Sequence, residues 1–340
     1  MQNENAKKQN VLLEIKDVKQ YFPVKKTKFF EEQRYVRAND GITIDIYEGE
    51  TLGLVGESGC GKSTFGRTVL QLYPQTHGEI IYHKDGKAIE LKKQSQEEMR
   101  VLRKDLQLIF QDPYSSLNPR MTVGQIIGEG LVSHGVFKRN DPALQEYVYE
   151  IMEKCGLARY MYGRYPHQFS GGQRQRIGIA RSLALKPRFV VCDEAVSALD
   201  VSIQSQILNL LSDLKQEENL TYLFITHDLS VVKYISDRIG VMYLGNMMEL
   251  ADSEELFANT LHPYTEALLS AIPTTEDDPD RERIILEGDI PSPVNPPSGC
   301  KFHTRCRYCQ DKCKTEEPKW TDVGNNHYVC CHFPLNSKKG

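Results

Sequence analysis

The feature that most constrains the fold is a glycine-rich octapeptide, GESGCGKS, at residues 56–63. A run rich in β-branched residues, ITIDIYEGETLGLV at 42–55, comes directly before it, with an exposed turn expected at 48–50. A helical pattern, STFGRTVLQLY, starts at its last residue. Glycines in such a loop let consecutive backbone N–H groups point at phosphate oxygens from the start of a helix. The segment therefore predicts a phosphate-binding loop between a strand and a helix.

The residues of this loop have separate expected roles. Lys62 is expected to reach the β- and γ-phosphates, and Ser63 is expected to ligate Mg²⁺. The other residues expected to surround the nucleotide are Gly56, Ser58, Gly59, Cys60, Gly61 and Thr64. Chance alone produces the four fixed positions in roughly one chain in a hundred of this length. The flanking strand and helix make a coincidence rarer still.

Further along the chain, the segment FVVCDE at 189–194 predicts a buried strand that ends in two carboxylates. Asp193 can hold Mg²⁺ through water, and Glu194 can polarise an attacking water molecule. The alternative, an ordinary buried strand that ends at a charged turn, is common. The position of the segment beyond a phosphate loop favours the hydrolytic pair.

The segment FSGGQRQR at 169–176 places a serine and two glycines immediately before a helical pattern. A plain helix cap is one interpretation and a second phosphate contact is the other. The residues that would make this contact are Ser170, Gly171, Gly172 and Gln173. The segment resembles the signature motif of ATP-binding-cassette ATPases, although Phe169 stands where many members have leucine. The order of the motifs is similar to that family over about the first 260 residues.

The resemblance implies roles for residues that their own surroundings do not identify. Gln111 in FQDP would contact Mg²⁺ and a membrane partner, and Asp200 in SALD would belong to the loop that contacts an opposite subunit. His227 would contact the γ-phosphate, whereas a lone histidine at a strand end is more often structural. Phe22 would stack on adenine, and the neighbouring Tyr21 is the alternative for that contact.

Strand and helix patterns alternate in the part of the chain beyond the loop. Short apolar runs at 106–110, 189–192 and 222–226 predict strands, and SIQSQILNLLSDLKQE between the last two is helical. Helical periodicity also extends over 123–157. The fold class expected is therefore α/β, and the resemblance specifies a P-loop (RecA-like) nucleotide-binding core with a helical subdomain and a small cysteine-rich C-terminal extension.

Domain boundaries follow from these patterns. We expect a nucleotide-binding domain at 1–260, with its helical subdomain at about 113–175, and a C-terminal extension at 261–340. A charged and proline-rich segment at 274–298 predicts a linker within the extension, and the segment at 23–39 predicts a surface insertion.

The chain has nine cysteines, and those of the extension are Cys300, Cys306, Cys309, Cys313, Cys330 and Cys331. Four thiolates suffice for zinc or an iron-sulfur cluster. The extension, with LHPYTEALLSAIP and GCKFHTRC, is similar to the C-terminal region of ATPase subunits of bacterial oligopeptide and dipeptide importers (OppF/DppF type), some of which carry a [4Fe-4S] cluster. This resemblance implies Cys300, Cys306, Cys313 and Cys331 as ligands. Zinc and reduced, unliganded thiols are the alternatives.

Composition limits the range of functions. The net charge of −4 gives no reason to expect a nucleic-acid partner, and no run of 18 apolar residues predicts a membrane span. The first ten residues lack the apolar core of a secretory signal. The chain is therefore expected neither to span a membrane nor to be secreted by that route, and the resemblance to importer ATPases implies a peripheral position on the cytoplasmic face of a bacterial cell membrane.

The resemblance implies an ATPase that powers peptide import, with ATP and Mg²⁺ as cofactors. Its expected partners are a second ATPase subunit, two membrane permeases and, through them, an extracellular substrate-binding protein. The alternatives are a nickel importer, an exporter, and a soluble cassette protein that acts on ribosomes or DNA. The last is less favoured because the chain has one phosphate loop and no long heptad run.

Overall fold

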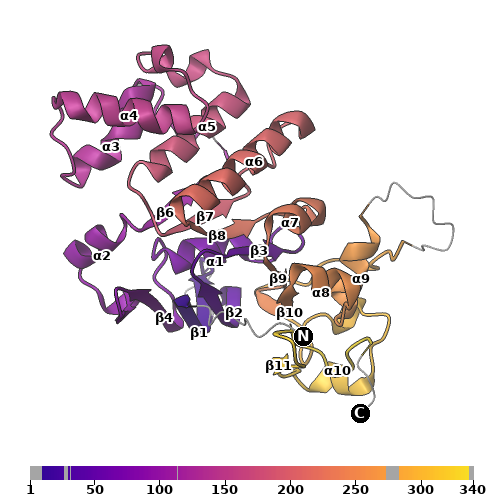
Figure 1. Ribbon diagram of the computed structural model, residues 1–340. Helices are drawn as coiled ribbons and strands as arrows, with labels where there is room; N and C mark the ends of the chain where they lie inside the picture. The colour runs from indigo at the N-terminus through magenta and orange to yellow at the C-terminus, as the bar shows by residue number, and fades with distance from the viewer. Residues whose placement is uncertain (1–9, 27–29, 31, 113, 273–282, 337–340) are drawn as a thin grey trace, which may run out of the picture. The chain divides into compact units, whose positions relative to one another are not determined.

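The structure is a computed structural model that describes residues 10–26, 30, 32–112, 114–272 and 283–336 (Figure 1). The N-terminal segment 1–9 and part of the predicted linker and insertion lie outside the described residues. The chain divides into two compact units. Of the described residues, those within 1–14, 45–50 and 80–223 belong to the first unit, and those within 15–44, 51–79 and 224–340 belong to the second.

The first unit has neighbouring buried strands that the apolar runs predicted. Strand β6 (Leu106–Ile109) is parallel to β7 (Phe189–Asp193), with Leu106 opposite Phe189 and Ile109 opposite Cys192. On its other side β7 neighbours β8 (Thr221–Ile225), which begins in this unit. Every residue of β7 and β8 is buried, which explains their continuous apolar sequences.

Helices make up most of the rest of the first unit. They are α2 (Gln96–Leu102), α3 (Val123–Ser133), α4 (Pro142–Lys154), α5 (Gly171–Leu183) and α6 (Val201–Glu218), with short 3₁₀ turns η1 (Leu91–Lys93), η2 (Arg159–Met161) and η3 (Pro166–Gln168). Figure 1 shows α3, α4 and α5 grouped together. Their buried faces include Ile127, Val148 and Ile179. The helical periodicity predicted over 123–157 corresponds to α3 and α4.

In the second unit, strands from the cysteine-rich end of the C-terminal extension, here called the tail, pair with strands of a sheet. Strand β3 (Thr51–Val55) is parallel to β9 (Arg238–Tyr243), and β9 is antiparallel to β10 (Asn246–Asp252). The tail strand β12 (Tyr328–Val329) pairs with β10, and β11 (Thr321–Asp322) pairs with β12. The tail is thus hydrogen-bonded to the sheet that contains β3.

Short helices accompany these strands. They are α1 (Lys62–Val69), α7 (Leu229–Ile235), α8 (Ser253–Ala258), α9 (Pro263–Ser270), η4 (His303–Arg305) and α10 (Asp311–Thr315). Helix α7 packs closely against β3, because a Cβ atom at Gly53 would lie 2.2 Å from Val232 Cγ1. Only glycine at position 53 permits this approach.

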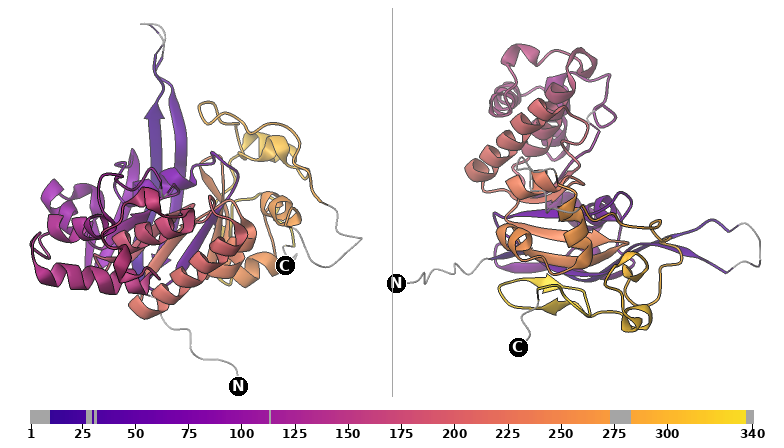
Figure 2. Two further views of the ribbon diagram at one scale, coloured as in Figure 1. Left: turned by 90° about the horizontal axis from the view of Figure 1, so that it is seen from above. Right: turned by 90° about the vertical axis from the view of Figure 1, so that its right-hand side faces the viewer.

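A smaller sheet has the order β2-β1-β4-β5, formed by β1 (Val11–Pro23), β2 (Tyr35–Tyr47), β4 (His77–Lys84) and β5 (Lys87–Glu90), with β5 antiparallel to β4. Figure 2 shows β1 and β2 side by side. Strand β2 begins at Tyr35, so the end of the predicted insertion is part of a strand. Residues 27–29 and 31 of that insertion lie outside the described residues.

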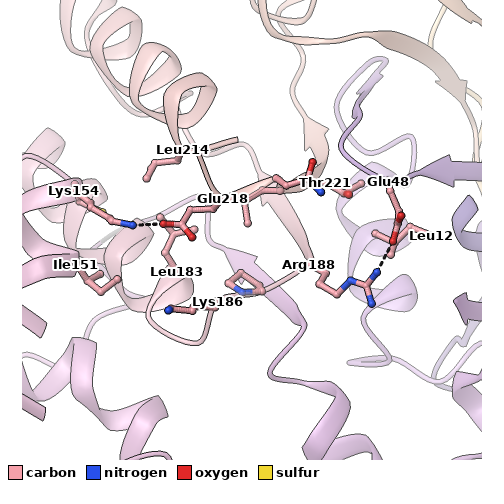
Figure 3. A pocket seen from close by; sticks show the side chains of 14 residues that line it. Leu12, Glu48, Ile151, Lys154, Leu183, Lys186, Arg188, Leu214, Glu218 and Thr221 are labelled. Carbon is pink, nitrogen blue, oxygen red and sulfur yellow. Dashed lines mark hydrogen bonds and ion pairs between the residues drawn. The ribbon is translucent and has the colours of Figure 1, made fainter. Parts of the chain in front are cut away.

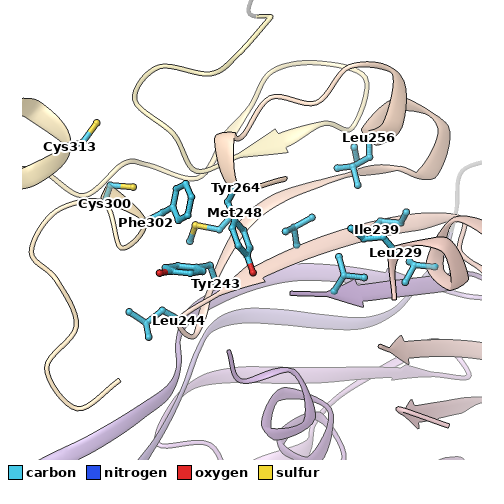
Figure 4. Packing of buried hydrophobic residues seen from close by; sticks show 14 residues of the cluster. Leu229, Ile239, Tyr243, Leu244, Met248, Leu256, Tyr264, Cys300, Phe302 and Cys313 are labelled. Atoms are coloured by element: carbon cyan, nitrogen blue, oxygen red, sulfur yellow. The ribbon is translucent and has the colours of Figure 1, made fainter. Parts of the chain in front are cut away.

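The core of the second unit combines residues of β9, β10 and their neighbouring helices with residues of the tail (Figure 4). Phe302 from the tail packs against Tyr243 of β9 and Tyr264 of α9, with ring centroids 5.2 Å away in both cases. Tyr243 and Tyr264 also contact each other at 4.9 Å between centroids. All three side chains are buried, so the tail contributes to the hydrophobic core of this unit.

Within the described residues, no helix combines the length and the hydropathy that a membrane crossing requires.

Candidate functional site

The glycine-rich loop connects β3 to α1 in the second unit and has a backbone that other residues would not adopt easily. Gly56 and Gly61 have φ angles of 148° and 107°. A Cβ atom at Gly56 would lie 2.1 Å from the Met242 carbonyl oxygen, and one at Gly61 would lie 2.1 Å from the Ala38 carbonyl oxygen. The loop therefore requires glycine at both positions, for conformation and for space.

Lys62, the first residue of α1, is buried within the loop. Its ammonium donates hydrogen bonds to the carbonyl oxygens of Gly56 at 2.7 Å and Glu57 at 3.0 Å, and lies 3.6 Å from the Cys60 sulfur. Burial raises the pKa of the Cys60 thiol. The loop thus presents a fixed cation beside a helix N-terminus, which suits a phosphate group.

Two further residues implied by the resemblance belong to the same unit. The Phe22 ring packs edge-on against Tyr73, 5.4 Å between centroids, while the Tyr21 hydroxyl donates to Asp40. Burial and, after it, the hydrogen bond to Asp40 raise the pKa of Tyr21. His227 is exposed just beyond β8, and the next residue, Asp228, caps α7.

The first unit contains the predicted hydrolytic carboxylates. Asp193 is buried at the end of β7, and Glu194 follows it in a left-handed conformation with φ 49°. A non-glycine residue in this region is uncommon and is often found at functional sites.

Gln111 and Glu194 follow two parallel neighbouring strands, β6 and β7, so both lie at the carboxyl edge of the sheet. The Gln111 side-chain amide donates to Glu194 Oε2 at 2.6 Å. The structure therefore joins two predicted site residues that are 83 positions apart in the sequence. The Gln111 amide is a neutral donor, so it holds the Glu194 carboxylate without placing a charge beside it.

Ser170 is the N-cap of α5 and forms a reciprocal capping box with Gln173. Ser170 Oγ accepts from the Gln173 N–H at 3.3 Å, and the Gln173 side chain accepts from the Ser170 N–H at 3.1 Å. A Cβ atom at Gly172 would lie 2.4 Å from Ile203 Cγ2, so this glycine permits α5 to approach α6. Gly171 has more room, with Leu199 Cδ2 3.6 Å from the corresponding Cβ position.

Asp200 caps α6, and its carboxylate accepts from the Ile203 N–H at 3.1 Å. That backbone hydrogen bond lowers the pKa of Asp200, so it is a carboxylate at neutral pH.

The four cysteines implied as ligands, Cys300, Cys306, Cys313 and Cys331, all line one small cavity of about 10 Å³ in the second unit. The two implied spares, Cys309 and Cys330, do not line it. Burial raises the pKa of Cys306 to about 11 and that of Cys331 to about 12, so both are protonated thiols at neutral pH in the absence of a metal.

The residue types around this cavity suit a thiolate metal site, but their spacing in the structure does not. In the described part of the chain, no group of three or more His, Cys, Asp or Glu side chains lies close enough together to hold a metal ion.

A larger cavity of about 250 Å³ lies entirely within the first unit (Figure 3). Apolar side chains such as Leu183 line it beside two ion pairs, Lys154–Glu218 and Arg188–Glu48. No residue predicted to act at the nucleotide site lines this cavity.

The predicted nucleotide-site residues are thus divided between the two units. The second unit contains Phe22, Gly56, residues 58–64 and His227, and the first contains Gln111, residues 170–173, Asp193, Glu194 and Asp200. Sequence reasoning missed the residues that hold the loop from outside it, Tyr264 and Arg305, which contact Glu57. Both residues lie in the segments LHPYTEALLSAIP and GCKFHTRC, which carry the resemblance to importer ATPases, and no periodicity in them indicates a contact with the loop.

Comparison with protein families gives two matches. The family described as ABC transporter matches residues 39–197, and the family described as oligopeptide/dipeptide transporter, C-terminal region, matches residues 248–313.

Similar proteins match almost the whole chain. The oligopeptide transport ATP-binding protein AppF of Bacillus subtilis (strain 168) is 51% identical over 331 residues, which cover 96% of this chain and 99% of AppF. The oligopeptide transport ATP-binding protein OppF of Salmonella typhimurium is 50% identical over 334 residues, which cover 97% of this chain and 98% of OppF.

Solved structures agree with the fold. A dimeric post-hydrolysis state of the ATP-binding cassette MJ0796 with ADP and Pi matches with a TM-score of 0.61 and 27% identity, covering 71% of this chain and 99% of that one. The structure of cbiO1 from Clostridium perfringens, part of the ABC transporter complex cbiONQ, matches with a TM-score of 0.61 and 25% identity, covering 73% and 91%. Together with the phosphate loop and the Gln111–Glu194 pair, these similarities show that the chain belongs to the ABC transporter family of ATPases, in the group with the oligopeptide/dipeptide transporter C-terminal region.

Proposed function

We propose that this chain is the ATP-hydrolysing subunit of a peptide importer, which acts peripherally at the cytoplasmic face of a bacterial cell membrane. The observation that carries the hydrolytic role is the Glu194 carboxylate, held by Gln111 at 2.6 Å at the end of a buried strand. The similarity to oligopeptide transport ATP-binding proteins, about 50% identity over nearly the whole chain, supports peptide as the cargo.

In this proposal the loop of the second unit binds the nucleotide phosphates. Lys62 and the N–H groups of Gly56 and residues 58–64 would contact the phosphate oxygens, and Phe22 would stack on adenine. Ser63, Gln111 and Asp193 would hold Mg²⁺, which neutralises phosphate charge when it is bound. His227 would contact the γ-phosphate.

Glu194 would act as the general base. It would accept a proton from the water that attacks the γ-phosphorus, and Gln111 would keep the carboxylate oriented toward that water. A base at the end of a rigid buried strand loses little freedom when the reaction begins.

Ser170, Gly171, Gly172 and Gln173 would contact the nucleotide of a second cassette, and Asp200 would lie at the same junction. ATP would then join two cassettes head to tail, and hydrolysis would release them. The dimeric cassette with ADP and Pi found among similar structures supports this arrangement. Two permeases would convert the closing and opening into transport of peptide delivered by an extracellular binding protein.

Reconstitution in liposomes with the neighbouring permeases and the second ATPase tests the cargo. Peptide loaded on the binding protein should stimulate ATP turnover severalfold over the unloaded binding protein. Stimulation by Ni²⁺-loaded binding protein and not by peptide would replace the proposal with nickel import. If peptide moved only in the direction opposite to import, with no uptake, the chain would be the ATPase of an exporter.

We propose that the tail cysteines Cys300, Cys306, Cys313 and Cys331 form a thiolate metal site, because they share one cavity that excludes Cys309 and Cys330. A metal would have to displace their protons and draw them closer together. Visible absorbance of anaerobically purified protein that a reductant bleaches would indicate [4Fe-4S]. A colourless protein with stoichiometric zinc would indicate zinc, and a colourless protein with neither metal would overturn the proposal.

A further inference from the structure

Glu57, the second residue of the phosphate loop, is held at three points. Its backbone N–H donates to the Tyr264 hydroxyl at 2.9 Å, and its backbone carbonyl accepts from the Lys62 ammonium at 3.0 Å. Its carboxylate is bound by both terminal nitrogens of Arg305, at 2.7 and 3.1 Å. All four residues belong to the second unit.

The ion pair between Arg305 and Glu57 is a specific interaction and not an incidental contact at the surface. The Arg305 side chain is only 6% exposed, and the two parallel hydrogen bonds match the planar guanidinium to the carboxylate. The guanidinium carbon also lies 5.9 Å from the centroid of the Tyr243 ring. Hydrogen bonding to Glu57 raises the pKa of Arg305, so the cation persists at any physiological pH.

Arg305 is positioned by the tail around it. It ends the 3₁₀ turn η4, between Phe302 in the aromatic core and Cys306 at the cysteine cavity. The residue reaches 248 positions back along the sequence to contact the loop.

Charge explains why this contact matters for nucleotide binding. A carboxylate inside a loop that binds phosphates repels the ligand unless a cation neutralises it. Arg305 supplies this cation and also fixes the residue whose carbonyl holds Lys62.

We propose that Arg305 of the tail is a positioning residue for nucleotide binding, which neutralises Glu57 and fixes the start of the phosphate loop. This inference rests on the nucleotide-binding role proposed above. It assigns to the tail a direct effect on ADP and ATP affinity.

The test measures Mg-ADP binding by the purified full-length chain, because ADP occupies one cassette without hydrolysis. Arg305→Ala should weaken ADP binding about tenfold, because the Glu57 carboxylate is left uncompensated. Glu57→Gln in the Arg305→Ala background should restore most of the lost affinity. A purely structural role for Arg305 would predict no such rescue.

Arg307→Ala is the matched control. Arg307 lies in the same tail segment, but its hydrogen-bond partners are Glu266, at 3.0 Å, and Tyr308, both outside the loop. Its ADP affinity should equal that of the wild type. Arg305→Lys keeps the charge without the planar fork, and it should retain more affinity than Arg305→Ala.

The outcomes separate the two claims. A wild-type chain that binds no ADP would overturn the proposed nucleotide-binding function. If wild type and Arg305→Ala bind ADP equally well, and thermal melting shows that both are folded, the inference about Arg305 alone is overturned. Weak binding by Arg305→Ala that Glu57→Gln fails to rescue would overturn the charge argument.

Discussion

Two helix N-termini in this chain carry glycine-rich motifs, and they are stabilised in different ways. The N-terminus of α5 is capped by its own residues, with Ser170 and Gln173 bonded to each other's backbone. The loop before α1 has no side-chain cap, and it is held instead by Tyr264 and Arg305, which lie 207 and 248 positions away from Glu57. The α5 motif is therefore a local structure that short-range sequence can form, whereas the phosphate loop depends on the folded tail.

The largest expected effect separates chemistry in the first unit from binding in the second. Glu194→Gln should reduce ATP turnover about a thousandfold, because the attacking water loses its base, and should leave ADP binding unchanged. Turnover is measured in the assembled transporter and normalised to the number of nucleotide sites, because a partner cassette contributes a site of its own. The control is Glu217→Gln, the same substitution at an exposed position of α6, and its ATP turnover should be normal. Near-normal ATP turnover by Glu194→Gln would show that Glu194 is not the general base.

The second-largest effect is expected when acid destabilises the region around Tyr264, one of the two residues that contact the phosphate loop from a distance. His262 caps α9, which contains Tyr264, and its Nδ1 accepts from the Tyr264 N–H at 3.0 Å. Burial lowers the pKa of His262 from 6.5 to about 4, against a smaller opposing effect of the Glu249 carboxylate. The unfolded chain therefore binds this proton more readily, and the stability is present above pH 6.5 and lost as the pH falls toward 4.

This loss should be about 3 kcal/mol in the free energy of unfolding, measured by urea denaturation between pH 7 and pH 4. His262→Asn retains a side-chain acceptor and does not titrate, so its stability should change less over the same range. If His262→Asn and the wild type lose equal stability on acidification, another group is responsible.

A smaller effect is expected from one hydroxyl group. Tyr264→Phe removes the acceptor of the Glu57 N–H and should cost about 2 kcal/mol of stability with a several-fold loss of ADP affinity. Tyr222→Phe is the control, because the Tyr222 hydroxyl is also buried and donates to the Leu211 carbonyl at 3.1 Å in the first unit. It should lose similar stability with unchanged ADP affinity. Equal ADP affinities in the two variants would show that the loop does not need its long-range contact.

The smallest effect concerns the local cap. Ser170→Ala should destabilise the chain by about 1 kcal/mol and leave its own ADP binding unchanged, while it lowers turnover of the assembled transporter. Thr122→Ala removes the similar capping box of α3 and provides the comparison. Equal ATP turnover in both variants would show that Ser170 acts only as a helix cap.

The parts of the fold that the sequence predicted are those with a local signal. The apolar runs at β7 and β8 are fully buried, and the glycines of residues 56–61 adopt conformations that few other residues tolerate. The capping box at Ser170 is also a local pattern. In each case the interacting residues are neighbours in sequence, so the pattern contains the physical cause.

The remaining contacts depend on which distant segments meet. Strand β12 has two residues, too few to show alternation, and its pairing with β10 is visible only in the structure. The bond between Gln111 and Glu194 follows from β6 and β7 being parallel neighbours, which neither strand's sequence specifies. The same holds for Arg305, whose exposed-looking segment HTRC gives no indication that the side chain is buried against the loop.

The contact between Glu57 and Arg305 also has a consequence for the order of synthesis. A ribosome completes Glu57 long before Arg305, and at 5–20 residues per second the 248 positions between them take roughly 10 to 50 seconds. Throughout that interval the nascent chain carries a phosphate loop that lacks its contact with Arg305. A chain truncated before the tail would keep every nucleotide motif and still lack the contacts that hold the first of them in place.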